Sequence, residues 1–302
     1  MHLNIWQTMF LALLQGVTEL FPISSLGHTV ILPGLFGWAN IETDTSCGGK
    51  SCFLPIIVAL HLGTAIALVL YFWRDWFQVA RSVAKSIKEG EVHTGTEEWV
   101  SFLIIIGCVP AGLLGVFLEE PLKLLFASPL IASTFLVVNG SLLFLGEQMR
   151  RQAQSKEAEL NPKEREAHFR SLSSLTWKEA VIVGFAQALA LIPGISRSGA
   201  TMVAGLGVRL NHEDAARYSF LLGTPIIGAA AVLELPQLKG QPGSVLLLVI
   251  MGMVLAGIAA FLSTKFLMKY FETGRLYPFA YYCWGAGLLA IILFLVVLHR
   301  GG

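Results

Sequence analysis

A glutamine, a glutamate, two serines and a histidine lie close together in a segment that is otherwise apolar. The segment reads Gln15-Gly-Val-Thr-Glu19-Leu-Phe-Pro-Ile-Ser24-Ser25-Leu-Gly-His28. Gln15 and Glu19 are four residues apart, so they share one face of a helix. The group offers a hydroxyl nucleophile, an imidazole that takes or gives a proton, and a carboxylate that orients the imidazole or holds a cation. This combination favours nucleophilic chemistry with acid–base support.

A second segment supplies a cation. Arg197 follows Ser196 in a stretch rich in glycine and serine. An arginine stays protonated, so a buried one needs an anion. We expect a helix to begin near residues 199–201, so that its free N–H groups and the guanidinium together form a cradle for phosphate. The predicted phosphate-binding residues are Arg197, Ser196, Ser198, Gly199 and Thr201. A structural ion pair between Arg197 and Glu19 is the alternative. The two arrangements can alternate if the substrate displaces the Glu19 carboxylate from Arg197.

The composition indicates a membrane protein. Hydrophobic residues make up 55% of the 302 residues and charged residues only 14%, against about 25% in ordinary soluble domains. Six apolar stretches are interpreted as full spans of a bilayer, which needs about 20 helical residues: residues 54–72, 101–118, 130–145, 218–235, 245–266 and 279–298. The third is short, and we expect it to extend toward Gln148. An ionised carboxylate inside a membrane costs about 2.5–3.5 kcal/mol on insertion scales, so Glu19 should face a partner or water. We therefore predict an all-α membrane protein with about six transmembrane helices.

Two further apolar stretches, residues 6–36 and 180–208, are interrupted by proline, glycine and hydroxyl residues. Backbone freed at such depth must be buried in protein or line a wet cavity, so we predict two re-entrant helix–loop–helix hairpins. A shift of 172 positions places Ser24 on Ser196 and Gly27 on Gly199, and it also aligns Gln15 with Gln187 and Thr29 with Thr201. Three spans between the hairpins make the copies inverted, an arrangement that usually builds a site near the midplane of the membrane.

The chain is predicted to be one polytopic domain, residues 1–302. The first repeat covers about 1–148, a cytoplasmic connector about 149–178 with a helix over 163–170, and the second repeat about 179–302. Under this topology one side carries 16 of the 21 Lys and Arg residues, which marks it as cytoplasmic. Both termini, and the loop with Cys47 and Cys52, then lie on the opposite side. These cysteines form either a small disulfide or two free thiols.

The strings QGVTELFPISSLGH and LIPGISRSGAT resemble the two signature motifs of the undecaprenyl-diphosphatase family, the bacitracin-resistance membrane phosphatases. The resemblance covers essentially the whole chain, including HLGTAIALVLYFWRDW after the first hairpin. It implies a hydrolase that converts undecaprenyl diphosphate to undecaprenyl phosphate and phosphate, recycling the carrier lipid for cell-wall synthesis and giving bacitracin resistance. It also implies a bacterial inner-membrane location, with a site that opens to the periplasmic side.

The resemblance also assigns roles to residues. Ser25 matches the proposed nucleophile and His28 the general acid–base residue, although attack by His28 stays open. Glu19 resembles a metal-associated glutamate, Gln15 the first position of its acidic pair, and Arg197 the phosphate-binding arginine. The expected cofactor is Mg²⁺ or Ca²⁺, which prefer oxygen ligands. Since Gln15 carries no charge, Glu19 and the diphosphate should hold most of the metal.

The implied partners are an isoprenoid diphosphate lipid and the bilayer. The net charge of +1 gives no reason to expect a nucleic acid, and the sequence leaves a homo-oligomer open. A prenyl-lipid flippase or secondary transporter is the main alternative, because inverted repeats and broken helices are common in transporters. Such a protein needs a path to both sides and no nucleophile. SSLGH and SRSG also resemble pieces of the acid-phosphatase-like motifs, but the flanking Lys/Arg-Pro and His-x3-Asp elements are missing.

Overall fold

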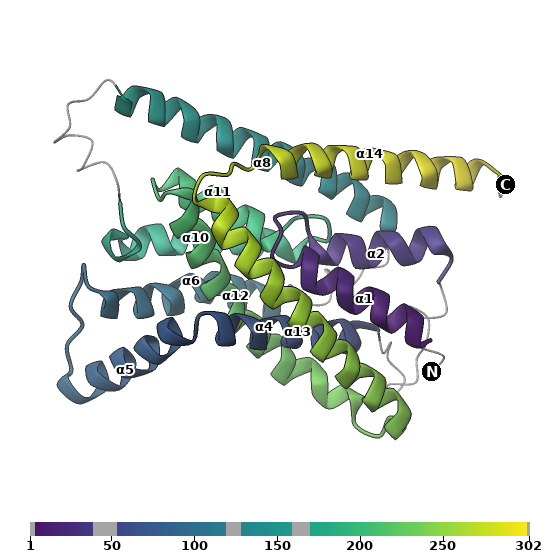
Figure 1. Cartoon of the computed structure of the whole chain (residues 1–302), viewed down its shortest axis with the longest axis horizontal. Helices are drawn as coiled ribbons and strands as arrows, with labels where there is room; N and C mark the ends of the chain where they lie inside the picture. Colours follow the sequence, from purple (N-terminus) through teal and green to yellow (C-terminus); the bar gives the residue numbers. More distant parts are fainter. Residues whose placement is uncertain (1–3, 39–52, 119–127, 159–169, 301–302) are drawn as a thin grey trace.

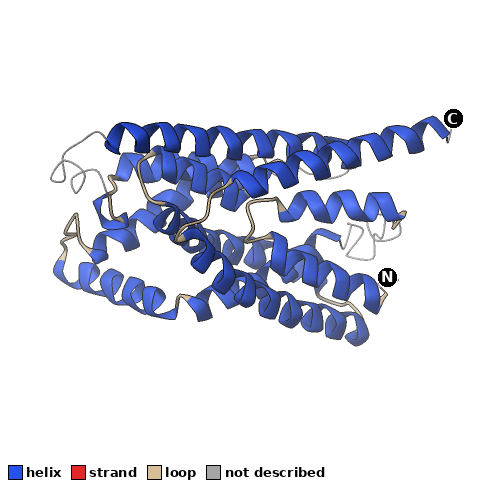
Figure 2. Ribbon diagram, turned by 45° about the horizontal axis from the view of Figure 1, so that its top comes forward, coloured by secondary structure: helices blue, strands red, loops and turns tan. Residues whose placement is uncertain are grey.

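The computed structural model describes residues 4–38, 53–118, 128–158 and 170–300. All regular structure in these ranges is helical (Figure 2). Six of the described helices are long and apolar enough to cross a membrane: α4 (Phe53–Tyr71), α6 (Glu97–Phe117), α8 (Pro129–Ala158), α12 (His212–Glu234), α13 (Gly243–Phe271) and α14 (Tyr277–Arg300). The predicted all-α membrane protein with six spans is confirmed. The third span is longer than predicted, since α8 continues into the connector.

Two pairs of shorter helices occupy the interrupted stretches. The first pair is α1 (Ile5–Thr18) and α2 (Ser25–Phe36). The second is α10 (Trp177–Ala188) and α11 (Arg197–Gly207), joined through the 3₁₀ turn η2 (Leu189–Leu191). The longest of these, α1, has 14 residues and spans about 21 Å at 1.5 Å per residue, which is too short for roughly 30 Å of hydrocarbon. The pairs are consistent with the predicted hairpins.

Capping residues set where these short helices begin. Asn4 forms a capping box with Gln7 at the start of α1, and Thr176 forms one with Glu179 at the start of α10. Such boxes satisfy N–H groups that the first helical turn leaves without partners. Helix α2 ends at Gly37, which has a left-handed conformation with φ of 66°, a backbone state that glycine adopts without steric cost.

Both termini lie at one end of the molecule, and the amphipathic helix α5 (Trp73–Glu89) lies at the other (Figure 1). Helix α5 is absent from the predicted elements, because its charges interrupt the apolar runs. It carries four of the basic residues assigned to the cytoplasmic side: Arg74, Arg81, Lys85 and Lys88. The arrangement is consistent with the predicted topology. Residues 163–169 of the predicted connector helix and the Cys47–Cys52 pair lie outside the described residues, and Arg170, the last residue of that predicted helix, is not helical.

Each hairpin packs against a span of the opposite repeat. Helix α1 packs on α13, and α10 packs on α6. Glycines allow this close approach: a Cβ atom on Gly16 would collide with the carbonyl oxygen of Ala256, and one on Gly184 with that of Gly107. Small residues are the usual means by which membrane helices approach closely. This reciprocal packing is consistent with the predicted inverted repeat.

The turns of the two hairpins meet beside α8. A Cβ on Gly27 would lie 3.0 Å from Cα of Gly194. Asn139 of α8 is fully buried and bonds to both turns. Its Nδ2 donates to the Pro22 carbonyl at 3.0 Å, and its Oδ1 accepts from the Ser196 N–H at 3.0 Å. One side chain of a spanning helix therefore holds the two turns in a fixed relation.

Candidate active site

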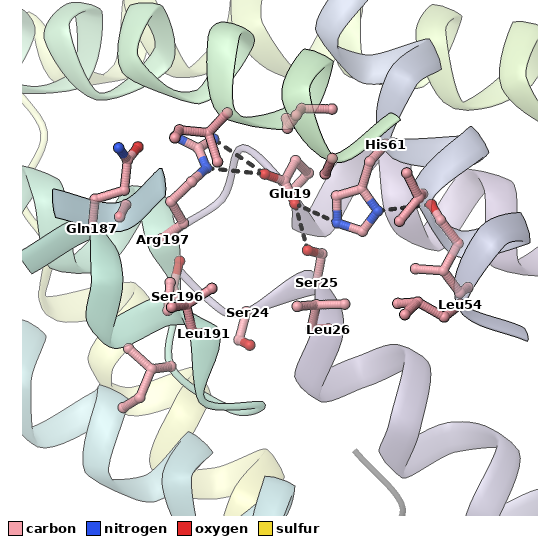
Figure 3. A pocket seen from close by; sticks show the side chains of 18 of the residues that line it. Glu19, Ser24, Ser25, Leu26, Leu54, His61, Gln187, Leu191, Ser196 and Arg197 are labelled. Carbon is pink, nitrogen blue, oxygen red and sulfur yellow. Dashed lines mark hydrogen bonds and ion pairs between the residues drawn. The ribbon is translucent and has the colours of Figure 1, made fainter. Parts of the chain in front are cut away.

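A cavity of about 250 Å³ lies where the hairpin turns face α4 and α12. Figure 3 shows the side chains of Ser25, Arg197 and His61 converging on Glu19 from the two hairpins and from α4. The polar lining consists of Glu19, Ser24, Ser25, His61, Gln187, Ser196, Arg197 and Glu234. The rest is mainly apolar and includes Leu26, Leu54, Ile57, Val58, Leu191 and Ile226. The cavity thus has the two kinds of surface that a lipid with a charged headgroup requires.

Glu19 is the centre of the polar network. It follows α1 directly and is only 6% exposed. Ser25 Oγ donates to Glu19 Oε2 at 2.5 Å. Arg197 donates to the other carboxylate oxygen, Oε1, from Nε at 3.2 Å and from Nη2 at 3.1 Å. The ion pair between Glu19 and Arg197 is therefore present, and it joins residues 178 positions apart in the chain.

Ser25 is the first residue of α2, and its position depends on Ser24. Ser24 caps the helix by accepting the Gly27 N–H at 3.1 Å. Its φ of 69° lies in the left-handed region, which is uncommon for a residue with a side chain and often marks a functional site. The turn into α2 therefore combines a helix cap with backbone strain directly before the candidate nucleophile.

Arg197 is the first residue of α11, so this helix begins two residues earlier than predicted. Ser196 caps it by accepting the Gly199 N–H at 3.1 Å. Besides its two bonds to Glu19, the guanidinium donates from Nη1 to the Ser219 carbonyl at 2.9 Å. These bonds use three of the five N–H donors of an arginine, which leaves two of them for a phosphate.

The structure does not bring every predicted phosphate-binding residue to the cavity. Of the five, Arg197 and Ser196 line it, whereas Ser198, Gly199 and Thr201 are buried behind it. Ser198 Oγ donates to the Phe21 carbonyl at 3.3 Å, and Thr201 Oγ1 donates to Ser219 Oγ at 2.6 Å. The early start of α11 at Arg197 is the reason: at 3.6 residues per turn, Ser198 and Gly199 point to other faces of the helix, and Thr201 returns to the Arg197 face one turn deeper.

His28 also lies apart from the Ser25 hydroxyl. Its Nδ1 donates to the Ser24 carbonyl at 2.7 Å, and its Nε2 is 2.8 Å from Oη of Tyr282 in α14. The two rings stack with centroids 5.7 Å apart. His28 is not among the described residues that line the cavity. The prediction that His28 activates Ser25 thus lacks the expected contact, since the Ser25 hydroxyl bonds to Glu19 instead.

His61 of α4 is a site residue that is absent from the predictions. Its Nε2 lies 3.2 Å from Glu19 Oε2, and its Nδ1 donates to the Ile57 carbonyl at 2.8 Å. The side chain is 13% exposed and lines the cavity. The signal that would have found it is an ionisable residue in an apolar span, which indicates function by default. Asn139 is another polar residue within an apolar span.

Gln15 offers a test of whether the site fits a cation. Its Nε2 lies 3.3 Å from Glu19 Oε2, while its Oε1 is buried with no hydrogen-bond partner. The two ends of an amide are assigned from their surroundings, and turning this one brings an oxygen toward the carboxylate. Within the described ranges, no cluster of three His, Cys, Asp or Glu residues forms a metal site. The amide and carboxylate oxygens nevertheless fit a hard divalent cation that also binds substrate.

Comparison with known proteins identifies the family. A family model described as "Bacitracin resistance protein BacA" matches residues 8–289. An "Undecaprenyl-diphosphatase" of Granulibacter bethesdensis is 44% identical, over 96% of this chain and 96% of that protein. Another, from Mycolicibacterium paratuberculosis, is 41% identical over 96% and 97%. The "Undecaprenyl-diphosphatase 2" of Frankia alni is 39% identical over 98% and 100%. On this evidence the chain belongs to the bacitracin resistance protein BacA family.

Proposed function

We propose that this protein hydrolyses undecaprenyl diphosphate to undecaprenyl phosphate and phosphate. The observation that carries the proposal is the chain of contacts from the Ser25 hydroxyl to Glu19 and from Glu19 to Arg197. A hydroxyl, a carboxylate and a guanidinium meet at one end of a cavity, which supports their roles as nucleophile, proton acceptor and phosphate-binding cation. The names of the relatives support the same substrate. The reaction recycles the carrier lipid for cell-wall synthesis, which accounts for bacitracin resistance.

The shape of the cavity fits the head of such a lipid. Its volume of about 250 Å³ lies just below the range of roughly 300–1,000 Å³ found for small-molecule sites. The diphosphate therefore occupies the polar end, and the first part of the prenyl chain contacts Leu26, Ile57 and Leu191. The remainder of the prenyl chain extends from the cavity into the bilayer. Moving it from apolar protein surface to lipid has little free-energy cost, because the two are similarly apolar.

The reaction proceeds in two displacements. Glu19 accepts the proton of Ser25 while Oγ attacks the terminal phosphorus. A bond forms between Oγ and phosphorus, the bridging P–O bond breaks, and the lipid monophosphate leaves. Water then attacks the phosphoserine, which releases phosphate and restores the hydroxyl. One water molecule is consumed in each cycle. His28 has a supporting role through Ser24 and Tyr282 in this scheme, in place of the proton transfer predicted for it.

Charge neutralisation is the second requirement, because phosphoryl transfer depends mainly on positioning and on electrostatic stabilisation. The two remaining N–H donors of Arg197 bind the terminal phosphate. The N-terminal ends of α2 and α11, which begin at Ser25 and Arg197, add the partial positive charge of the helix dipoles. Glu19 and the amide oxygen of Gln15 would hold Mg²⁺ or Ca²⁺, which would neutralise further charge on the diphosphate.

We also propose that the cavity opens to the periplasm and that the protein lies in the bacterial inner membrane. Leu54, next to the first residue of α4, and Glu234, the last residue of α12, both line the cavity. These helix ends belong to the side of the chain termini, because α4 continues toward the basic helix α5 (Figure 1). Positive charge marks the cytoplasmic side, so the termini side is periplasmic.

Phosphate release by the purified protein in detergent tests the proposal. Undecaprenyl diphosphate is supplied with Mg²⁺, Ca²⁺ or EDTA, and Ser25→Ala serves as the inactive variant. Ser133→Ala is the matched control, because Ser133 is a buried hydroxyl that bonds within α8 to the Pro129 carbonyl. We expect the native protein and Ser133→Ala to release phosphate and Ser25→Ala to release none. If the folded protein releases no phosphate but moves undecaprenyl diphosphate across the bilayer of proteoliposomes, the protein is a transporter.

A further inference from the structure

We infer that His61 supplies a nitrogen ligand to the divalent cation that binds at Glu19, so that the cation site combines Gln15, Glu19 and His61. The first two come from α1 and the residue that follows it, and the third comes from α4. The inference rests on the proposed function, since the cation is required there with the diphosphate. It changes the expected site from oxygen ligands alone to a mixed set of oxygen and nitrogen.

The hydrogen bond at the far side of the ring fixes which nitrogen of His61 can bind a cation. A carbonyl oxygen only accepts, so Nδ1 must carry the hydrogen that it donates to Ile57 at 2.8 Å. In the neutral imidazole, Nε2 then carries a lone pair. Metal-binding histidines almost always donate their other N–H to a carbonyl or a carboxylate, which fixes ring and tautomer in this way. His61 has this arrangement already.

The lone pair of His61 Nε2 faces Glu19 Oε2, with which it cannot form a hydrogen bond because neither atom carries a hydrogen. Glu19 Oε2 lies 3.2 Å away, and a carboxylate oxygen also carries lone pairs. A positive charge between the two atoms removes the repulsion. Ligands at about 2.0–2.2 Å from a cation are roughly 3 Å apart when they subtend about 90–100° at the metal. The observed separation suits two adjacent ligands of one ion.

Gln15 provides an independent indication at the same place. It is fully buried, and its Oε1 has no hydrogen-bond partner, which normally carries a free-energy cost. Its other amide atom lies 3.3 Å from Glu19 Oε2. Turning the amide places the oxygen there, so the Gln15 amide and the His61 imidazole each lie within 3.3 Å of the same carboxylate oxygen, Glu19 Oε2. A cation satisfies all three groups at once.

The alternative is a protonated His61 that forms an ion pair with Glu19. The charge of Glu19 is already matched by Arg197, whose guanidinium donates twice to the carboxylate. An imidazolium would therefore add an uncompensated positive charge to a largely buried cavity. A cation adds charge too, but it arrives with a diphosphate that neutralises it. We therefore expect strong binding of the metal only when a diphosphate is present.

A nitrogen ligand also changes which metal is preferred. Imidazole suits first-row transition metals better than Ca²⁺; Mn²⁺ prefers oxygen ligands but, as a first-row transition metal, also binds sites that mix oxygen and nitrogen, whereas Mg²⁺ and Ca²⁺ prefer oxygen ligands alone. We expect Mn²⁺ to bind more tightly than Ca²⁺ in the native protein. His61→Gln, which replaces the nitrogen by an amide oxygen, should weaken Mn²⁺ binding at least about tenfold, since loss of a group that only orients a ligand already costs about 10–100-fold. Ca²⁺ binding should change less.

Pulsed electron paramagnetic resonance of bound Mn²⁺ tests the ligand directly. The full-length protein in detergent is mixed with Mn²⁺ and methylenediphosphonate, an inorganic diphosphate analogue that is not hydrolysed. We expect the spin echo to show modulation from an imidazole ¹⁴N nucleus. The modulation should vanish in His61→Gln and in the shorter His61→Asn, which guards against misfolding of either variant. It should persist in the control His28→Gln, because His28 is bonded to Ser24 and Tyr282.

Three results would overturn the inference: no Mn²⁺ binding by the native protein, binding without nitrogen modulation, or modulation that survives both His61 variants. Phosphate release from undecaprenyl diphosphate is measured on the same protein preparations with Mn²⁺ and without the analogue. Release without nitrogen ligation rejects the role of His61 and leaves the phosphatase activity standing. Nitrogen ligation without release supports the site and rejects the phosphatase activity.

Discussion

Ser25 and Arg197 occupy equivalent positions in the two hairpins, at the offset of 172 residues that relates the two repeats. Each is the first residue of its helix, and each follows a serine cap whose Oγ accepts an N–H at 3.1 Å. Both side chains bond to Glu19. The same local fold therefore presents a nucleophile from one repeat and a cation from the other.

The equivalent of Glu19 in the second repeat is Leu191, which also lines the cavity. The two repeats have thus diverged at a position that lines the cavity. One contributes the carboxylate of the polar end, and the other contributes apolar surface. The proposed lipid diphosphate has a polar head and an apolar chain, so it needs both the carboxylate and the apolar surface. Divergence at this position therefore lets a symmetric architecture form an asymmetric site.

Gly223 of α12 makes room for the Arg197 guanidinium, since a Cβ there would overlap it. We expect Gly223→Ala to displace the arginine from Glu19 and to lower kcat/KM about 100-fold, as a misplacement of about 1 Å can do. Thermal stability should change little, because a flexible side chain is what moves. Gly228→Ala is the control, since a Cβ at that position of the same helix meets open space. Equal activity of the two variants would contradict the role of Gly223.

Glu19→Gln keeps the shape of the side chain but removes the proton acceptor of Ser25. General-base catalysis typically contributes 10²–10⁴-fold, so we expect kcat to fall by about that factor in the phosphate-release assay. Glu147→Gln is the control: Glu147 is a buried carboxylate outside the cavity that bonds to His212 and to the Leu276 N–H. Retained activity in Glu19→Gln would assign proton transfer to another group.

His28 and Tyr282 are expected to act as one unit, because His28 Nε2 and Tyr282 Oη are 2.8 Å apart. His28→Gln and Tyr282→Phe should each lower kcat to a similar degree, and the double variant should be no worse than the weaker single variant. Contacting residues show such non-additivity. A double-mutant cycle on kcat measures it. If His28→Gln abolishes turnover while Tyr282→Phe is fully active, His28 acts on the substrate itself.

Asn139→Ala should separate the two hairpin turns. It removes the partner of the Ser196 N–H, at about 1–3 kcal/mol for a buried group, and leaves the Pro22 carbonyl with only the weak Cys283 thiol contact at 4.0 Å. We expect a lower temperature of unfolding and a loss of activity greater than the unfolded fraction explains. Thr134→Ala on the same helix is the control, since Thr134 is exposed and bonds only to Leu130. An unchanged melting temperature in Asn139→Ala would show that the turns are held by other contacts.

Glu179 should make stability depend on pH at the start of α10. Burial raises the pKa of Glu179, but hydrogen bonds from Arg170 and Thr176 outweigh it and hold the pKa below its usual value of 4.5. A lowered pKa in the folded state means that the carboxylate stabilises the fold fully above about pH 4.5 and loses this effect as the pH falls through the folded-state pKa. Melting temperatures of the native protein and Glu179→Gln should therefore differ near neutral pH and converge in acid. A constant difference would exclude the effect.

The sequence by itself determined the class of the protein and the polar residues around which a site could form. Apolar runs of about 20 residues can be satisfied only by spanning helices, because lipid offers no hydrogen bonds to the backbone. Polar residues in such runs are costly enough to mark function, which is why Glu19, Ser25 and Arg197 could be named from the chain alone. The repeat of 172 residues indicated that the two segments meet.

Only the tertiary structure decided which groups contact each other. His28 is three residues from Ser25, yet its ring faces Tyr282, 254 residues away. His61 comes from another helix and reaches Glu19 at 3.2 Å. The direction of a side chain depends on the residue at which its helix begins. Ser24 and Ser196 set those first residues as caps, and the sequence alone predicts such a boundary only to within a few residues. Contacts between helices depend on packing. Gly27 and Gly223 have no side chain, which lets distant segments approach closely, and the Asn139 amide bonds to both hairpin turns.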